Sequence, residues 1–180
     1  MASYELIPFQ KDFHAVTIVA AVETEQASTL NVGFWITDPY QTVQWTSSQD
    51  QLARQDFLWQ HTCFEIFIGI QEQDPYREIH LVPPHAWQAY QFEEYRYPES
   101  TPPQIAADIT LQDLQRTAYG LKASLDLSEF MRNHRLQWDD LYLGLCAVID
   151  TQTGQQLYAL QHQSLSQADF HNKRDWLHRF

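Results

Sequence analysis

The stretch Leu58-Trp59-Gln60-His61-Thr62-Cys63-Phe64-Glu65-Ile66-Phe67-Ile68 is the part of the chain from which the fold can be worked out. From position 62 onward it is rich in aromatic and β-branched residues, as strands are. Successive side chains of a strand point to opposite faces. One face is apolar and predicts the core: Phe64, Ile66 and Ile68. The other face carries Glu65 between Cys63 and Phe67, where a buried charge needs a partner.

Trp59 stands six residues before Glu65. An aromatic ring can cover the C–H face of a polyhydroxylated ligand, while a carboxylate accepts hydrogen bonds from its hydroxyl groups. The pair therefore favours a ligand of this kind. The alternative is an ordinary sheet strand in which Glu65 forms an ion pair with an arginine.

Strand patterns dominate the rest of the sequence, and turn-prone segments separate them. The expected strands are 4–9, 15–24, 30–37, 42–46, 62–70, 77–82, 87–92, 105–111, 117–126, 141–150 and 156–162. Residues 141–149 are apolar on both faces and predict a central, buried strand. The apolar face of 117–126 is predicted to consist of Tyr119, Leu121, Ala123 and Leu125. Short strands at this spacing predict an all-β fold, an antiparallel β-sandwich of the jelly-roll or immunoglobulin-like kind.

One or two short helices are expected beside the strands. Residues 127–134 fit two helical turns with Ser128 as the cap. Residues 48–57 fit a second short helix. A length of 180 residues and the absence of a composition shift predict a single domain over 1–180.

Composition narrows the classes of partner and the compartment. The formal net charge of -12 argues against binding to nucleic acid, which needs a basic footprint, and against an anionic membrane surface. The N-terminus lacks the basic start and apolar run of a signal peptide, which predicts a cytoplasmic protein. In that compartment Cys63 and Cys146 are expected to be reduced thiols rather than a disulfide.

Motifs of common enzyme chemistry are missing from the sequence. There is no glycine-rich phosphate loop, no G-x-S-x-G nucleophile elbow and no His-Glu-x-x-His zinc pattern. The sequence therefore predicts no catalytic activity, no cofactor and no metal site. The histidines considered as possible ligands are scattered along the chain: His61, His80, His85, His162 and His171.

Two further regions are dense in aromatic and charged residues. Residues 78–96 fit two strands joined by the Pro83-Pro84 turn, and so predict a hairpin beside 62–70. Arg96 is the basic group expected to pair with Glu65 or with a ligand, because a guanidinium offers five donors in a fixed fork. Residues 157–176 are expected to dock as a last strand and to contribute to a site.

Three ordered motifs carry a resemblance to a known family. They are Trp59-Gln60-His61-Thr62-Cys63-Phe64-Glu65-Ile66-Phe67, then Trp87-Gln88-Ala89-Tyr90-x-Phe92-x-x-Tyr95-Arg96, and finally Tyr158-Ala159-Leu160-x-His162 with Asp169-Phe170-His171. Together they resemble bacterial DOMON-like proteins, which belong with the family 9 carbohydrate-binding modules. The resemblance implies a β-sandwich that binds a sugar.

The resemblance also implies roles for particular residues. Trp59 matches the tryptophan that forms one wall of the sugar site, and Glu65 matches the glutamate that hydrogen-bonds the sugar. Trp176 stands where a second tryptophan closes the site, with Phe170 as a substitute. His61-Thr62-Cys63 depart from the pattern, because the modules usually have acidic residues between the tryptophan and the glutamate.

The sequence thus predicts a non-catalytic protein that binds a small carbohydrate or similar polar ligand on an aromatic-lined face. The predicted ligand-binding residues are Trp59, Glu65, Arg96, Phe170, His171 and Trp176. One alternative is haem or metal binding through His61, His162 or His171. Another is hydrolysis with Glu65 and either Asp169 or His171 as acid and base. A third is a structural module that binds another protein and no small ligand.

Overall fold

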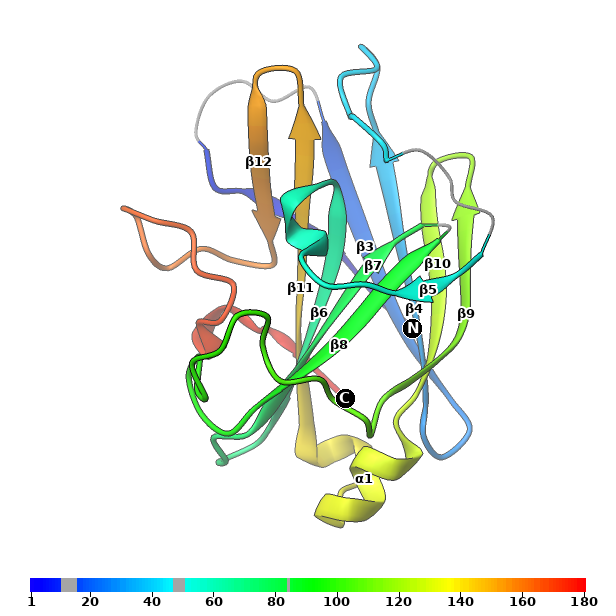
Figure 1. Ribbon diagram of the computed structural model, residues 1–180, viewed down its shortest axis with the longest axis vertical. Coiled ribbons are helices and arrows are strands. Elements are labelled where there is room, and N and C mark those ends of the chain that lie inside the picture. The colour runs from blue at the N-terminus through cyan, green and yellow to red at the C-terminus, as the bar shows by residue number, and fades with distance from the viewer. Residues whose placement is uncertain (11–15, 47–50, 84) are drawn as a thin grey trace.

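The computed structural model describes residues 1–10, 16–46, 51–83 and 85–180. Two β-sheets pack face to face, with one short α-helix at an end of the sandwich (Figure 1). The five-stranded sheet has the order β1 (Ala2–Glu5), β3 (Thr17–Glu25), β4 (Thr29–Thr37), β10 (Gly120–Asp126) and β9 (Thr110–Thr117). The predicted all-β sandwich is confirmed.

The second sheet has eight strands and carries most of the residues that concern function. Its order is β2 (Ile7–Pro8), β12 (Gly154–Ala159), β11 (Leu141–Thr151), β6 (Cys63–Ile70), β7 (Tyr76–Val82), β8 (Ala86–Phe92) and β5 (Ala53–Arg54). A last short strand, β13 (His178–Arg179), pairs with β11. Neighbouring strands of this sheet are antiparallel except β5 and β8, which run parallel to each other. The predicted hairpin beside β6 is confirmed, although Pro84 of its expected turn lies outside the described residues. The expected last strand within 157–176 is displaced: β12 ends at Ala159, and the last strand, β13, follows at 178–179.

The main core lies between the two sheets and takes every second side chain of β6. Phe64, Ile66 and Ile68 are completely buried in it, as their alternation predicted. The ring of Phe64 packs at 4.9 Å from that of Phe34 on β4. β11 lies between β12 and β6 and is buried along almost its whole length, so the prediction of a central strand is also confirmed.

The predicted strand 4–9 is divided between the two sheets. β1 joins the five-stranded sheet and β2 joins the larger one. Leu6, which lies between them, is buried in the core, and its N–H donates to the carbonyl of Ile18 at 2.8 Å. The chain therefore passes from one sheet to the other at the residue whose side chain enters the interior.

The expected helix over 48–57 is wrong where the structure describes it. Positions 48–50 lie outside the described residues, while Ala53 and Arg54 form β5 at the edge of the larger sheet. The N–H of Ala53 donates to the carbonyl of His85 at 2.9 Å, and the Arg54 guanidinium lies 4.2 Å from the Trp87 ring. Pairing with this sheet edge outweighs the local helical pattern.

The second expected helix exists, although its cap differs from the prediction. The helix α1 (Ser128–His134) begins at Ser128, so Ser128 lies inside the helix and Leu127 is its N-cap. The Asp126 carboxylate accepts a hydrogen bond from the N–H of Ser128 at 2.8 Å. An aspartate two residues earlier therefore does what the serine was expected to do.

Three other expected strands are shorter or displaced. In 42–46 Val43 forms only an isolated bridge with Thr151, and in 105–111 pairing as a strand starts at Thr110. The segment 117–126 contains the turn between β9 and β10, which leaves Tyr119 71% exposed, whereas Leu121, Ala123 and Leu125 are buried. The turn needs the positive φ of Gly120, 154°, and this requirement overrides the apolar alternation at Tyr119.

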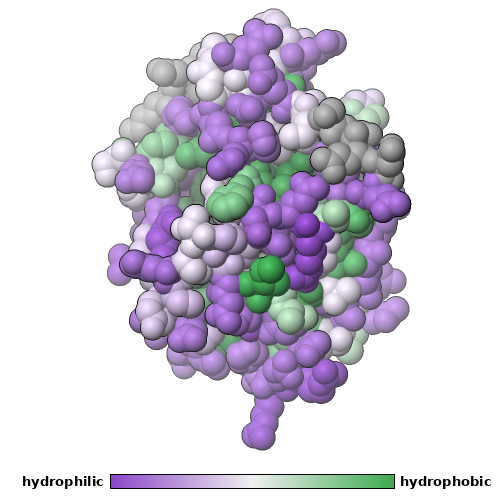
Figure 2. All heavy atoms as spheres, viewed as in Figure 1, coloured by the Kyte–Doolittle hydropathy of each residue, from purple (hydrophilic) through white to green (hydrophobic). Residues whose placement is uncertain are grey.

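Three short 3-10 turns complete the chain: η1 (Leu58–Gln60), η2 (Trp138–Asp140) and η3 (Lys173–Asp175). Cys63 and Cys146 are free, buried thiols. Among the described residues, no helix combines the length and the apolar character that a membrane span requires. The face in Figure 2 is mostly hydrophilic, and its apolar side chains lie in small, separate groups rather than in one large patch.

Candidate functional site

The outer face of the larger sheet carries a second layer of buried side chains. Two connecting segments lie against this face, on the left of Figure 1. They are the loop after β8, residues 93–109, and the C-terminal segment, residues 160–177. The buried members of the layer are Phe67, Tyr76, Tyr90, Phe92, Tyr142, Cys146, Ala159 and Trp176, with Trp59 and Phe170 packed against them. These rings shield polar groups of β6 and β7 from solvent.

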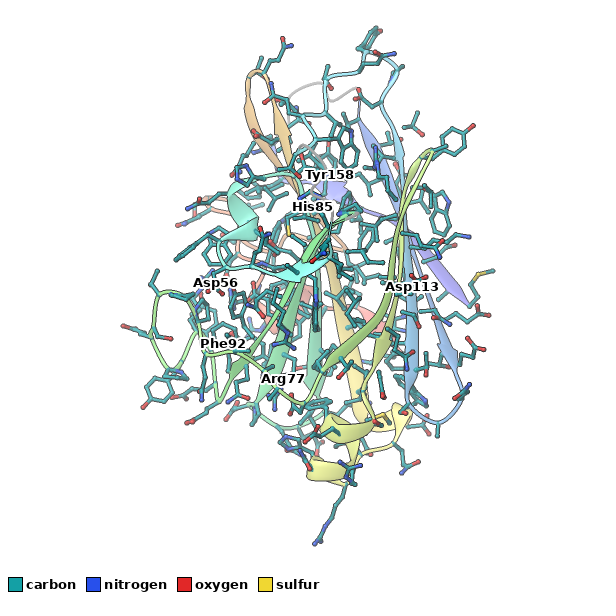
Figure 3. The ribbon with its side chains drawn as sticks, turned by 45° about the vertical axis from the view of Figure 1, so that its right-hand side comes forward. Asp56, Arg77, His85, Phe92, Asp113 and Tyr158 are labelled. Carbon is teal, nitrogen blue, oxygen red and sulfur yellow. The ribbon has the colours of Figure 1, made fainter. Side chains whose placement is uncertain are left out.

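A cavity of about 700 Å³ opens in this second layer. It lies between η1, β6, β7, β12, the loop after β8 and the C-terminal segment. Phe92, which lines it, lies in Figure 3 on the side away from Asp113 of the five-stranded sheet. Five of the six predicted ligand-binding residues line this cavity: Trp59, Glu65, Arg96, Phe170 and His171.

Trp59 comes from η1, which places its ring at the end of β6. The ring is partly buried and makes edge contacts with the rings of His80 and Tyr90, at centroid distances of 5.5 and 6.1 Å. The Tyr90 hydroxyl donates to Asp56 at 2.9 Å, which ties β8 to the chain just before η1. Trp59 is therefore held by its neighbours while part of its ring remains available to a ligand.

Glu65 contributes a buried carboxylate to the cavity lining. It is 3% exposed, and its carboxylate has no hydrogen-bond donor among the described residues. The nearest opposite charge is His80 Nε2, 3.8 Å from Glu65 Oε1. Burial raises the pKa of the Glu65 carboxyl to about 7, although the charge of His80 opposes this shift.

Glu78 and His80 lie two residues apart on β7 and point to the same face. Glu78 Oε1 accepts a hydrogen bond from His80 Nε2 at 2.7 Å. Burial disfavours the charged imidazolium, but Glu65 and Glu78 together outweigh it and raise the pKa of His80. Burial likewise opposes ionisation of Glu78, yet His80 lowers the pKa of that carboxyl below its ordinary value. Both shifts favour the charged pair of Glu78 and His80, while Glu65 is the carboxyl whose pKa lies near neutral pH.

His171 connects the C-terminal segment to β7. Its Nδ1 lies 2.7 Å from the Tyr76 hydroxyl, which also accepts a hydrogen bond from the N–H of Arg96 at 3.1 Å. With that N–H donating to its oxygen, the hydroxyl is oriented to donate to Nδ1. Nε2 of His171 then faces Glu78 Oε2 at 3.8 Å. Burial lowers the pKa of His171, so the ring lines the cavity as a neutral imidazole.

Arg96 lines the cavity and, of its two expected partners, does not take Glu65: it pairs with Asp169 instead. Its guanidinium donates to Asp169 Oδ1 at 2.9 Å, and the Tyr95 hydroxyl donates to the other oxygen of Asp169 at 2.8 Å. The backbone of Arg96 adopts a φ of 52°, which is uncommon for a residue with a side chain. Arg96 and Asp169 thus join the loop after β8 to the C-terminal segment.

Trp176 does not line the cavity. It is 1% exposed, its ring stacks on Phe67 at 5.2 Å, and its Nε1 donates to the Phe170 carbonyl at 2.8 Å. The ring also fills the space above Gly144, where an added Cβ would lie 2.3 Å from Trp176 Cδ1. Trp176 therefore holds Phe170 in place from behind, and Phe170 supplies the ring that the cavity uses.

The histidines of the alternative metal prediction do not gather. His61 is exposed, and His162 Nε2 is 2.9 Å from the carbonyl of Ile7, whereas His171 lines the cavity. Among the described residues, the potential ligand atoms that do lie within 4.8 Å of one another belong to Cys63, Glu65 and His80.

Sequence reasoning missed the roles of Glu78 and His80. Both alternate with the core residues Ile79 and Leu81, which places them on the face opposite the core. That alternation in the sequence could have indicated that both side chains lie on the outer face. It could not have indicated the strand register that sets His80 opposite Glu65.

No protein-family model matches the sequence, and no curated protein matches it. A crystal structure of a "putative carbohydrate-binding protein" from Bacteroides uniformis matches with a TM-score of 0.64 and 12% identity, over 97% of this chain and 84% of that one. At this identity the match shows a shared β-sandwich fold.

Proposed function

We propose that the protein binds a small, neutral carbohydrate, or a chemically similar polyhydroxylated ligand, in the cavity of the second layer. The observation that carries the proposal is Glu65. Its buried carboxylate lines the cavity and lacks a hydrogen-bond donor among the described residues. A buried polar group in this state costs free energy until a partner supplies the missing hydrogen bond.

A ligand hydroxyl is the partner that fits this carboxylate. Hydroxyl groups donate to carboxylates without bringing a second charge into the cavity. Two hydroxyls on adjacent carbons can serve both oxygens of Glu65 at once. A ligand rich in hydroxyls therefore satisfies Glu65 better than a ligand that only accepts hydrogen bonds.

The aromatic residues of the lining complement the other part of a sugar. Trp59, Phe92 and Phe170 present rings to the cavity. Sugar rings carry C–H groups that pack favourably on the electron-rich face of an aromatic ring. The combination of rings and one free carboxylate supports a sugar over a ligand that is entirely polar or entirely apolar.

The charges of the lining favour a neutral sugar. Three carboxylates line the cavity, those of Glu65, Glu78 and Glu99, against the single guanidinium of Arg96. Arg96 is already paired with Asp169. A uronic acid would bring a further negative charge to this lining, which is unfavourable at short range. The similarity to the Bacteroides protein, which is named as a carbohydrate-binding protein, supports a carbohydrate as the ligand but does not distinguish neutral from acidic sugars.

Isothermal titration calorimetry tests the proposal with a panel of neutral monosaccharides and oligosaccharides, each paired with its uronic acid. We expect binding of at least one neutral sugar, weakened by Trp59→Ala at least about tenfold, equivalent to 1.4 kcal/mol. Trp35→Ala is the matched control, because Trp35 is a partly exposed tryptophan on β4 of the other sheet. It should leave the affinity unchanged.

Three results would contradict the proposal. One is the absence of heat with every sugar at millimolar concentration. Another is an equal effect of the Trp59 and Trp35 substitutions, which would place binding elsewhere. The third is the appearance of shortened sugar products after incubation, which would show that the protein hydrolyses the sugar.

A further inference from the structure

Cys63, Glu65 and His80 form a compact cluster on the outer face of the larger sheet. Cys63 and Glu65 lie two residues apart on β6 and point to the same face, and His80 stands opposite Glu65 on the neighbouring strand β7. One ligand atom from each of the three lies within 4.8 Å of the other two. All three side chains are buried, with exposures of 0, 3 and 1%.

The donor atoms of the cluster are a thiol sulfur, a carboxylate oxygen and an imidazole nitrogen. This mixed set is typical of zinc sites, in which Zn–S distances are about 2.3 Å and Zn–N and Zn–O distances about 2.0–2.2 Å. Tetrahedral ligand atoms at such distances lie roughly 3.3–3.8 Å apart. The three side chains would need to close by about 1 Å, which side-chain rotations can supply.

The cluster also contains polar atoms that the protein leaves without partners. Nδ1 of His80 is buried and has no hydrogen-bond partner among the described residues, and the Glu65 carboxylate receives no hydrogen bond there. Nε2 of His80 lies 2.7 Å from Glu78 Oε1 and 3.8 Å from Glu65 Oε1. A carboxylate that holds the ring of a ligating histidine is usual beside a protein-bound metal, and Glu78 is placed to do this for His80.

We propose that Cys63, Glu65 and His80 bind a Zn²⁺ ion behind the wall of the cavity. Glu78 would orient His80 and so act as a positioning residue. Three protein ligands leave the fourth coordination position of the ion open. Since Glu65 is the ligand that lines the cavity, this open position would face the cavity. Binding displaces into the solvent the proton of the Cys63 thiol and any proton held by Glu65 or by the ligating nitrogen of His80, so uptake of the ion releases protons.

The proposal goes beyond sugar binding and is tested without a sugar. The protein is first freed of metal with a chelator and then titrated with Zn²⁺ alone and, separately, with Co²⁺. We expect one ion per chain and, with Co²⁺, an intense near-ultraviolet thiolate-to-metal absorption band. The wild-type spectrum alone can overturn the proposal, because Co²⁺ bound without that band excludes Cys63 as a ligand.

Two cysteine variants give a matched pair. Cys63→Ser should lose the Co²⁺ band and weaken Zn²⁺ binding at least about 100-fold, since even the outer partners of metal ligands are worth 10–100-fold. Cys146→Ser is the control, because Cys146 is also a free, buried cysteine on this face but lies outside the cluster. It should change neither measurement.

Glu65→Gln is a second variant, nearly identical in shape, in case the serine variant fails to fold. It should weaken Zn²⁺ binding while circular dichroism stays that of the wild type. No stoichiometric Zn²⁺, or equal losses in the Cys63 and Cys146 variants, would overturn the proposal. Neither result bears on sugar binding, which is measured separately in the presence of chelator.

Discussion

The two faces of β6 are buried to the same degree but by different parts of the molecule. Phe64, Ile66 and Ile68 face the other sheet and meet only the core. Cys63, Glu65 and Phe67 face a layer built from η1, the loop after β8 and the C-terminal segment. The inner face excludes polar groups, whereas the outer face encloses a carboxylate and leaves a cavity beside it. The contrast teaches that burial by a sheet serves stability, while burial by connecting segments leaves room for a ligand.

The largest effect is expected on the inner face. Phe64→Ala removes a completely buried ring that contacts Phe34, and we expect unfolding free energy to fall by about 3–5 kcal/mol. Urea denaturation followed by circular dichroism measures this loss. A decrease below about 1 kcal/mol would mean that the inner face is not the main source of stability, and the comparison would fail.

Substitution of Glu65, the next residue along β6, is expected to raise the free energy of unfolding rather than lower it. Glu65 has a pKa of about 7 in the folded protein against an ordinary value of 4.5, so ionisation opposes folding. Below about pH 4.5 both states hold the proton and nothing is lost. The cost grows between these two pH values and is fully present above about pH 7. Glu65→Gln should therefore stabilise the metal-free protein by roughly 1–3 kcal/mol at pH 8.

The pH dependence shows whether the stabilisation by Glu65→Gln comes from ionisation of Glu65 or from a change in stability that is the same at every pH. The gain from Glu65→Gln should disappear by about pH 4.5, while sugar affinity falls at every pH because an acceptor is lost. Asp113→Asn, the same change at an exposed position of β9, is the control and should alter stability by less than about 0.5 kcal/mol. Equal stability of the Glu65 variant and the wild type at pH 8 would show that the carboxylate is not under strain from burial.

An effect of about the same size is expected where the outer layer rests on the sheet. Gly144→Ala places a methyl group against the Trp176 ring, and we expect a loss of about 1–3 kcal/mol together with weaker sugar binding through the displaced Phe170. Tryptophan fluorescence and calorimetry follow the two consequences.

Adding Trp176→Phe to Gly144→Ala should restore part of the lost stability, because the smaller phenylalanine ring leaves room for the added methyl group. Residues in contact couple by roughly 0.5–3 kcal/mol. Additive losses would mean that the two residues do not meet as the structure shows.

Much of the site could be predicted from alternation alone. The positions of Phe64 and Glu65 on opposite faces of one strand follow from a local rule, because backbone geometry fixes the alternation within a few residues. Trp59 and His171 were expected among the ligand-binding residues, and the structure places both in the lining of the cavity. Trp176 was expected as a wall and instead supports one, because its burial depends on Gly144 of a distant strand.

The amino-acid sequence was enough to establish an all-β sandwich, the buried face of β6 and the presence of a carboxylate on its other face, since each depends on neighbours along the chain. It could not establish that His80 stands opposite Glu65, because strand register depends on pairing between segments. Nor could it establish that His171 reaches Tyr76, 95 residues away in the sequence. The cavity exists only because such distant segments fold over the same face of one sheet, and the free energy that brings them there comes from packing of the whole domain.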